Sequence, residues 1–275
     1  MKAYDLWFEN GTGIGQHPLL EATRPLPADA PVGWIGSAGP GVDPRTWPRG
    51  PLTGLPMFHA LTLLLPPDYR RRGPDLPAVS FFQGEGQFAH PRAPADHTRG
   101  PHAVEDPFEL DLARAVDHPQ LQRRTDVIDG RFALLWLTKE EYARGPVAPP
   151  PDTRRPGEHV ADDQGPNAWD TLTPTRSVWL LERDDPNVGR VPVDPMAADD
   201  TPGWTNRYTP DFSDRAPWAE GLGRYHLGGT SMPVQSLPDG LTPFFLEIDE
   251  LPGLNFGGGS AQIDLESDTF DWACG

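Results

Sequence analysis

The stretch TPFFLEIDELPGLNFGGGSAQIDL, residues 242–265, contains two short hydrophobic runs separated by a glycine triplet. The first run, FFLEID, alternates its positions between two faces, which is the period of a β-strand. Gly257–Gly259 precede a second alternating run, AQIDL. Glycines before a strand are typical of a bulge or of a close approach between two backbones. The stretch therefore predicts two strands of a sheet joined by a glycine-rich turn.

Three carboxylates, those of Glu247, Asp249 and Glu250, lie at the end of the first run. Glu247 and Asp249 share one strand face, and two such carboxylates are able to ligate a hard cation or to act as acid and base. They are also typical of the solvated face of an antiparallel sheet. We expect the solvated face, because no histidines or further carboxylates lie nearby at a matching spacing. The alternative is that the three acids contact a basic protein partner.

Strand patterns recur on both sides of this stretch. Asp129-Gly130 lies between the runs TDVI and RFALLWL, and Asp-Gly between apolar runs predicts a hairpin. Phe270 and Trp272 share one face of FDWACG, so we expect this C-terminal strand to be buried and internal to the sheet. His59 lies inside an apolar run, which favours a core histidine with satisfied hydrogen bonds. Further strands are predicted at residues 56–65, 77–88 and 177–182.

Helices are expected to be short and few. Asp106 is able to cap a helix that begins at Pro107. Thr138 and Glu141 match a capping box directly after the RFALLWL strand. Residues 146–176 are rich in proline and acid and have little hydrophobic periodicity, which predicts a loop-rich excursion.

Two segments of the chain echo each other. GLPMFHALTLLLPPDY followed by AVSFF is similar to GLTPFFLEIDELPGL followed by AQIDL. Each has a glycine, a phenylalanine-led strand, a proline and then a second strand. The fold class that follows is α+β and strand-rich. We expect a mainly antiparallel sheet of two pseudo-repeated halves, with a few short helices and long Pro/Gly-rich loops.

Composition supports one folded domain, residues 1–275. The 35 prolines and 29 glycines indicate long loops, while nine tryptophans and twelve phenylalanines indicate a real core. The net charge of −17 repels nucleic-acid phosphates and anionic lipid, so neither nucleic acid nor a membrane is an expected partner. Cys274 is the one cysteine, which excludes an intramolecular disulfide and a cysteine zinc site. The N-terminal residues contain no signal-peptide pattern, and we expect a cytoplasmic protein.

The C-terminal segments RYHLGGTSMPVQ, TPFFLEIDE and FDWACG resemble the end of the YwqG-like proteins, a bacterial family described as a domain of unknown function. Trp47-Pro48 and GLPM (residues 54–57) are similar to earlier segments of that family. Glu247 departs from the pattern, because glutamine is usual there, and Leu63 and Leu64 stand where an acid is expected in the first copy. The matching C-terminal positions are His226, Gly228, Gly229, Pro233, Gln235, Glu247, Ile248, Asp249, Trp272, Cys274 and Gly275.

The resemblance implies a cytoplasmic, strand-rich single domain built of two related halves, and no catalytic mechanism comes with it. Some members of the family lie beside toxin genes, which implies an immunity role. Together with the charge, this favours a non-enzymatic binding protein that neutralises a basic partner such as a toxin. Glu247, Asp249 and Glu250 are the candidate partner-binding residues.

The alternative function is a metal-dependent hydrolase. His90, His97 and His102 lie close together in FAHPRAPADHTRGPHAVED, and imidazole is a zinc or iron ligand. Their spacing matches no helical or hairpin pattern, and we expect neither a metal nor another cofactor. GTGIG (residues 11–15) lacks the strand and the helix that a phosphate loop needs, which favours a flexible turn.

Overall fold

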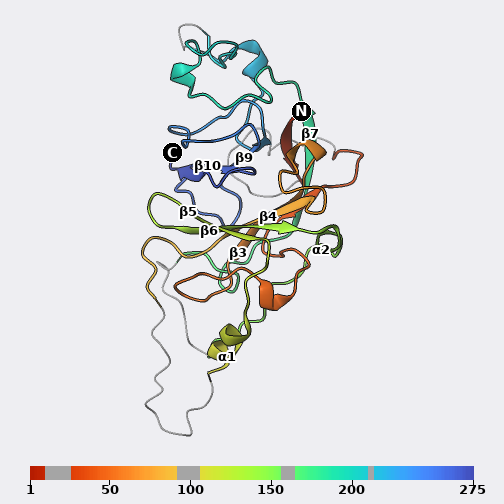
Figure 1. Ribbon diagram of the computed structural model, residues 1–275, viewed down its shortest axis with the longest axis vertical. Helices are drawn as coiled ribbons and strands as arrows, with labels where there is room; N and C mark the ends of the chain where they lie inside the picture. The colour runs from red at the N-terminus through yellow and green to blue at the C-terminus, as the bar shows by residue number, and fades with distance from the viewer. Residues whose placement is uncertain (10–25, 92–105, 156–164, 210–213) are drawn as a thin grey trace.

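The computed structural model describes residues 1–9, 26–91, 106–155, 165–209 and 214–275. Within these residues, eleven strands build one antiparallel sheet, and two short helices, α1 (Pro107–Arg114) and α2 (Lys139–Ala143), accompany it (Figure 1). The predicted strand-rich α+β class is confirmed. The strands are β1 (Ala3–Phe8), β2 (Gly33–Ile35), β3 (Phe58–Leu64), β4 (Ala78–Gln83), β5 (Leu121–Thr125), β6 (Arg131–Leu137), β7 (Arg176–Arg183), β8 (His226–Leu227), β9 (Phe245–Asp249), β10 (Ser260–Asp264) and β11 (Phe270–Ala273).

The strands follow the spatial order β11-β10-β9-β8-β1-β7-β2-β3-β4-β6-β5, and neighbours in this order pair antiparallel. The first and last strands of the order, β11 and β5, lie next to each other. The sheet therefore curls until its two edges meet. We call this line the seam, with residues 121–128 on one side and residues 266–273 on the other.

Side chains hold the seam together without a backbone ladder. The Trp272 indole N–H donates a hydrogen bond to the Asp126 carboxylate. Arg124 pairs with Asp268 at 3.2 Å and donates to the Ser267 carbonyl at 3.4 Å. Burial lowers the pKa of the Arg124 guanidinium and is the largest of the effects that act on that pKa. The seam is thus a polar junction between two parts of the chain that are far apart in sequence.

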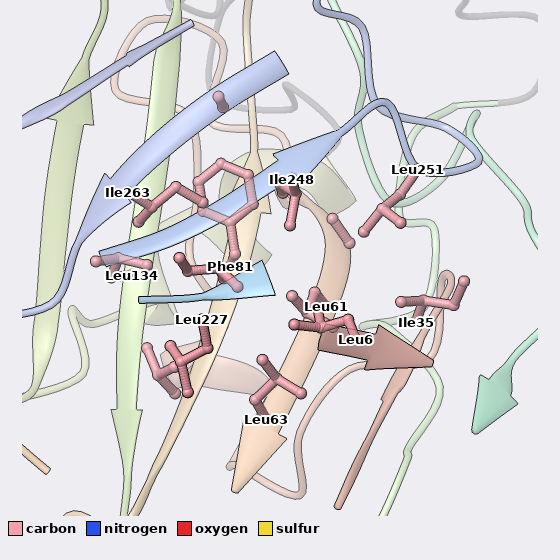
Figure 2. Close-up of a cluster of buried hydrophobic side chains, with 14 of the residues drawn as sticks. Leu6, Ile35, Leu61, Leu63, Phe81, Leu134, Leu227, Ile248, Leu251 and Ile263 are labelled. Atoms are coloured by element: carbon pink, nitrogen blue, oxygen red, sulfur yellow. The ribbon is translucent and has the colours of Figure 1, made fainter. Parts of the chain in front are cut away.

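The main core lies inside the curl, where both halves of the chain contribute. Figure 2 shows Leu61 and Phe81 from the first half close to Ile248 and Ile263 from the second. The two echoed segments form equivalent antiparallel pairs, β3 with β4 and β9 with β10, and each pair sends alternate apolar residues into this core. Aromatic rings close the core near the seam, with the ring centroids of Phe132 and Phe270 4.6 Å apart.

The opposite face of β3, β4 and β6 is covered by a second apolar cluster. Trp47 packs edge-on against Phe82 at 5.5 Å and donates its indole N–H to the Met57 carbonyl. Loops rich in proline and glycine supply this cover. In the predicted excursion, the described residues 146–155 and 165–175 form no helix or strand, as expected. No helix among the described residues is long and apolar enough to cross a membrane.

The local signals for helices and the hairpin are confirmed. The Asp106 side chain accepts a hydrogen bond from the first turn of α1, and Thr138 and Glu141 form the capping box of α2. Asp129 has φ = 74° in the tight turn that joins β5 to β6. The run TDVI, however, is not the strand: β5 ends at Thr125 and the following apolar residues occupy the turn.

The expectation for the C-terminal strand is half right. Phe270 is buried, as predicted, but Trp272 is only partly buried, and β11 is an edge of the ladder that pairs only with β10 among the described strands. The physical reason is the curl of the sheet. Because β5 already contacts β11 through side chains, the strand is enclosed without having a second hydrogen-bonded neighbour.

Candidate functional site

Glu247 lies on the face of β9 that points away from the main core, and it is fully buried, with 0% of its surface exposed. Its carboxylate accepts hydrogen bonds from the Ser231 hydroxyl at 2.6 Å and from the Met232 N–H at 2.8 Å. His226 Nε2 on β8 lies 3.3 Å away. Burial acts to raise the pKa of Glu247, but His226 and these donors outweigh it, so the pKa is lowered.

The prediction that Glu247 faces solvent is therefore wrong. The loop that carries Ser231 and Met232 folds over the strand face and covers it. This loop begins with Gly228 and Gly229, whose φ angles of 65° and 81° suit glycine. The alternation within one strand predicts which residues share a face. It does not predict whether a distant loop covers the face that points away from the core.

Asp249 and Glu250 have separate surroundings. Asp249 is half-buried, 3.9 Å from Arg224, and burial raises its pKa. Glu250 accepts hydrogen bonds from the N–H groups of Phe256 and Gly258, and so it holds the glycine-rich turn in place. Partner contact by these two residues stays a prediction, whereas the buried Glu247 is closed to a partner.

The glycine triplet has an architectural role. A side chain on Gly259 would place its Cβ 1.6 Å from the Ala273 carbonyl oxygen, so only glycine lets β10 and β11 approach this closely. Gly258 has φ = 79° and donates to Glu250. The predicted glycine-rich turn between two strands is confirmed.

Two histidines have structural surroundings. His226 Nδ1 lies 2.9 Å from the Gly228 carbonyl oxygen and so holds the glycine turn that follows β8. His59 Nδ1 lies 2.6 Å from the Gly36 carbonyl oxygen, and its Nε2 lies 2.8 Å from Thr62 Oγ1. His59 is thus the satisfied core histidine that the sequence predicts.

We predict that His59 stays neutral throughout the physiological range. Desolvation lowers its pKa to about 4, compared with about 6.5 for a free histidine. A nitrogen-detected NMR titration should show this imidazole predominantly neutral from about pH 7 down to about pH 5. The unfolded chain binds a proton at this histidine more readily than the folded protein does. The free energy of unfolding should therefore fall as the pH drops below about 6.5. A midpoint above about 6 would contradict the prediction.

The histidine cluster of the hydrolase alternative cannot be assembled from the described residues. His90 is exposed, and His97 and His102 lie outside the described residues, as does GTGIG. In the part of the chain that the structure describes, no group of three or more His, Cys, Asp or Glu side chains is placed to hold a metal ion. The hydrolase therefore stays an untested alternative.

A pocket opens at one end of the seam, and no single motif of the sequence pointed to it. It is a cavity of about 230 Å³ between β4, the β5–β6 turn and β11. Its apolar lining comes mainly from aromatic side chains, and carboxylates and amides supply the polar lining. The lining includes Gln83, Glu85, Phe88, Asp126, Phe132 and Trp272.

Two buried carboxylates line this pocket with neutral donors only. Glu85 accepts from the N–H groups of Leu52 and Thr53 and from the Thr53 hydroxyl. Asp126 accepts from Trp272 and from two N–H groups of its own turn. Among the described residues, no cationic side chain pairs with either carboxylate. Beside them, burial and the charge of Asp126 raise the pKa of Asp271.

Exposed apolar side chains lie at the pocket: Phe88 and Ile128 line it, and Val127 precedes Ile128 in the same turn. Phe88 is 62% exposed, and Val127 and Ile128 at the tip of the turn are 82% and 40% exposed. Large apolar groups gathered at a pocket are typical of an interaction site. We call Phe88, Val127, Ile128 and the pocket the seam surface. The sequence signal that could have found it is the pair Val127-Ile128, which stands next to Asp129-Gly130 and so belongs to a turn.

Two further hollows among the described residues have balanced charges or few polar groups. A cavity of about 370 Å³ beside α1 contains Arg49 and Arg123, but these are paired with Asp111 and Asp117. A hollow of about 600 Å³ is lined mainly by small and apolar residues around Val42. The seam pocket differs from these two in that, among the described residues, no cationic side chain pairs with the carboxylates that line it. Comparisons with protein-family models, with curated proteins and with solved structures gave no match.

Proposed function

We propose that this chain is a non-enzymatic binding protein that neutralises a basic protein partner, in the manner of an immunity protein, and that it binds through the seam surface. The observation that carries the proposal is the combination of exposed apolar side chains with the buried carboxylate of Asp126, which has no cationic partner among the described residues. Aromatic side chains with a polar or charged rim around them are typical of the centre of a protein interface.

Charge supports the same proposal over longer distances. The chain carries 40 acidic and 23 basic residues, and a field of that sign accelerates the approach of a basic protein. A toxin that acts on nucleic acid presents the matching positive surface, because its own substrate is polyanionic. The resemblance to the YwqG-like family, some of whose members lie beside toxin genes, supports the immunity role as part of this proposal.

The partner to test is the protein encoded by the gene adjacent to that of this chain. We predict that Phe88→Ser combined with Val127→Ser weakens its binding at least about tenfold, or about 1.4 kcal/mol. Both side chains are exposed, so folding should be unaffected. The matched control is Leu172→Ser with Val191→Ser, which removes apolar groups of 76% and 62% exposure away from the seam. Titration calorimetry gives the affinities, and circular dichroism confirms the fold.

Salt and a generic basic protein separate specific binding from charge attraction. Raising the salt from about 0.05 to about 0.5 M should slow association with the partner while leaving the apolar contribution in place. Lysozyme, a small basic protein, should bind weakly and equally to the wild type and to the seam variant. Equal affinity of the partner for the seam variant and the control variant would contradict binding at the seam surface. Absence of binding to any basic protein would refute the proposed function.

A further inference from the structure

We infer that the seam pocket receives one arginine side chain of the basic partner; this inference rests on the proposed function and specifies its central contact. The pocket would hold the planar guanidinium between aromatic walls and beside the carboxylate of Asp126. The exposed side chains at the mouth, Phe88 and Ile128, would cover the aliphatic stem of the arginine.

The size of the pocket favours one side chain. Small-molecule sites span about 300–1,000 Å³, and this cavity is about 230 Å³. It opens at the surface of the turn that carries Val127 and Ile128, which are exposed. A residue projecting from a partner's loop is able to enter here without a change in the sheet.

Charge determines the sign of the occupant. A buried carboxylate is costly unless a cation or several hydrogen bonds compensate it. Asp126 accepts from two N–H groups of its own turn and from the Trp272 indole, and among the described residues no cationic side chain pairs with it. Arg131, the cation in the adjoining strand, is paired with Asp129 at 2.8 Å. A positively charged side chain would be attracted to the Asp126 carboxylate, and an anion would be repelled.

The walls favour arginine over lysine. Phe88, Phe132 and Trp272 line the pocket, and a guanidinium stacks on aromatic faces while donating hydrogen bonds in its own plane. The Trp272 ring is held in place by its bond to Asp126 and by stacking at 6.0 Å on Phe256. A lysine ammonium is more strongly hydrated and loses more on entering such a site.

The test uses four capped tripeptides with the full chain: acetyl-Gly-X-Gly-amide, in which X is arginine, lysine, citrulline or norleucine. Citrulline has the shape of arginine without its charge. We expect the arginine peptide to shift the Trp272 indole N–H signal in a two-dimensional NMR spectrum with saturation. Lysine should bind about threefold more weakly and citrulline at least about tenfold more weakly. Norleucine should produce no saturable shift.

A conservative variant tests the aromatic wall. Phe88→Leu keeps an apolar side chain at an exposed position, so folding should be preserved, but it removes the ring. It should weaken the arginine peptide about threefold and leave the citrulline peptide unchanged. The control variant Leu172→Ala, at another exposed apolar position, should change neither.

The outcomes separate this inference from the proposed function. Equal binding of arginine and citrulline peptides, or no saturable shift with arginine, overturns the arginine site. If the adjacent-gene protein nevertheless binds with the predicted dependence on Phe88 and Val127, the proposed function stands without it. If the arginine peptide binds selectively but no basic protein does, the pocket has the inferred specificity and the immunity-type function is refuted.

Discussion

Replacing Glu247 by alanine should lower the free energy of unfolding by about 3–5 kcal/mol, because it leaves two buried donors without their acceptor and opens a cavity at a fully buried site. The donors that lose their acceptor are the Ser231 hydroxyl and the Met232 N–H, and His226 Nε2 loses the carboxylate that lies 3.3 Å away. For a chain of this size the melting temperature should fall by on the order of 10 °C. Chemical denaturation gives the free energy directly.

Two control variants place the effect at this position. Glu182→Ala removes an exposed carboxylate from β7, whose ion pair with Lys2 is at the surface, and should cost less than about 1 kcal/mol. Glu247→Gln keeps the shape and an acceptor oxygen but removes the charge opposite His226, so its cost should lie between those of the other two. A change of less than about 0.5 kcal/mol for Glu247→Ala would contradict the buried anchor and favour a solvated face.

Lowering the pH should remove the contribution of the Glu247 carboxylate to the free energy of unfolding. The pKa of Glu247 is lowered in the folded protein, so its contribution is complete above the unfolded value of about 4.3 and is lost as the pH falls through the folded value. The difference in unfolding free energy between the wild type and Glu247→Gln should therefore shrink below about pH 4.3. A difference that grows on acidification would contradict this sign.

Deletion of residues 270–275 should abolish soluble expression. The deletion removes β11, and with it Phe270, whose ring packs 4.6 Å from Phe132 inside the core. Loss of a buried phenylalanine side chain alone costs about 3–5 kcal/mol. The deletion also removes Trp272, which closes the seam on Asp126. The free energy of unfolding of a domain is usually about 5–15 kcal/mol, so the combined loss is a large share of it.

Smaller changes identify the cause of this loss. Phe270→Ala should destabilise the protein by most of the expected amount while leaving the chain length unchanged. Deletion of Cys274 and Gly275 alone, both exposed, should leave the protein soluble and its melting temperature nearly unaltered. A soluble 1–269 protein with cooperative unfolding would show that neither the edge strand nor the seam is needed for the fold.

Most of the local structure was predictable because its causes are local. The period of two in FFLEID and AQIDL, the Asp129-Gly130 turn and the capping residues of both helices depend on neighbours within a few positions. His59 was assigned to the core for the same reason, since the apolar run around it leaves little else. These elements together are sufficient for the strand-rich α+β class.

The candidate site depended on contacts that no local pattern contains. Glu247 is buried because a loop 15 and 16 residues earlier in the chain folds over its strand and provides Met232 and Ser231. The seam pocket exists because Trp272 meets Asp126, 146 residues away, when the sheet curls. The sequence by itself determined which residues form strands and which faces alternate. Only the tertiary structure decided which face is covered and where the two edges meet, because burial and unneutralised charge depend on segments that are distant along the chain.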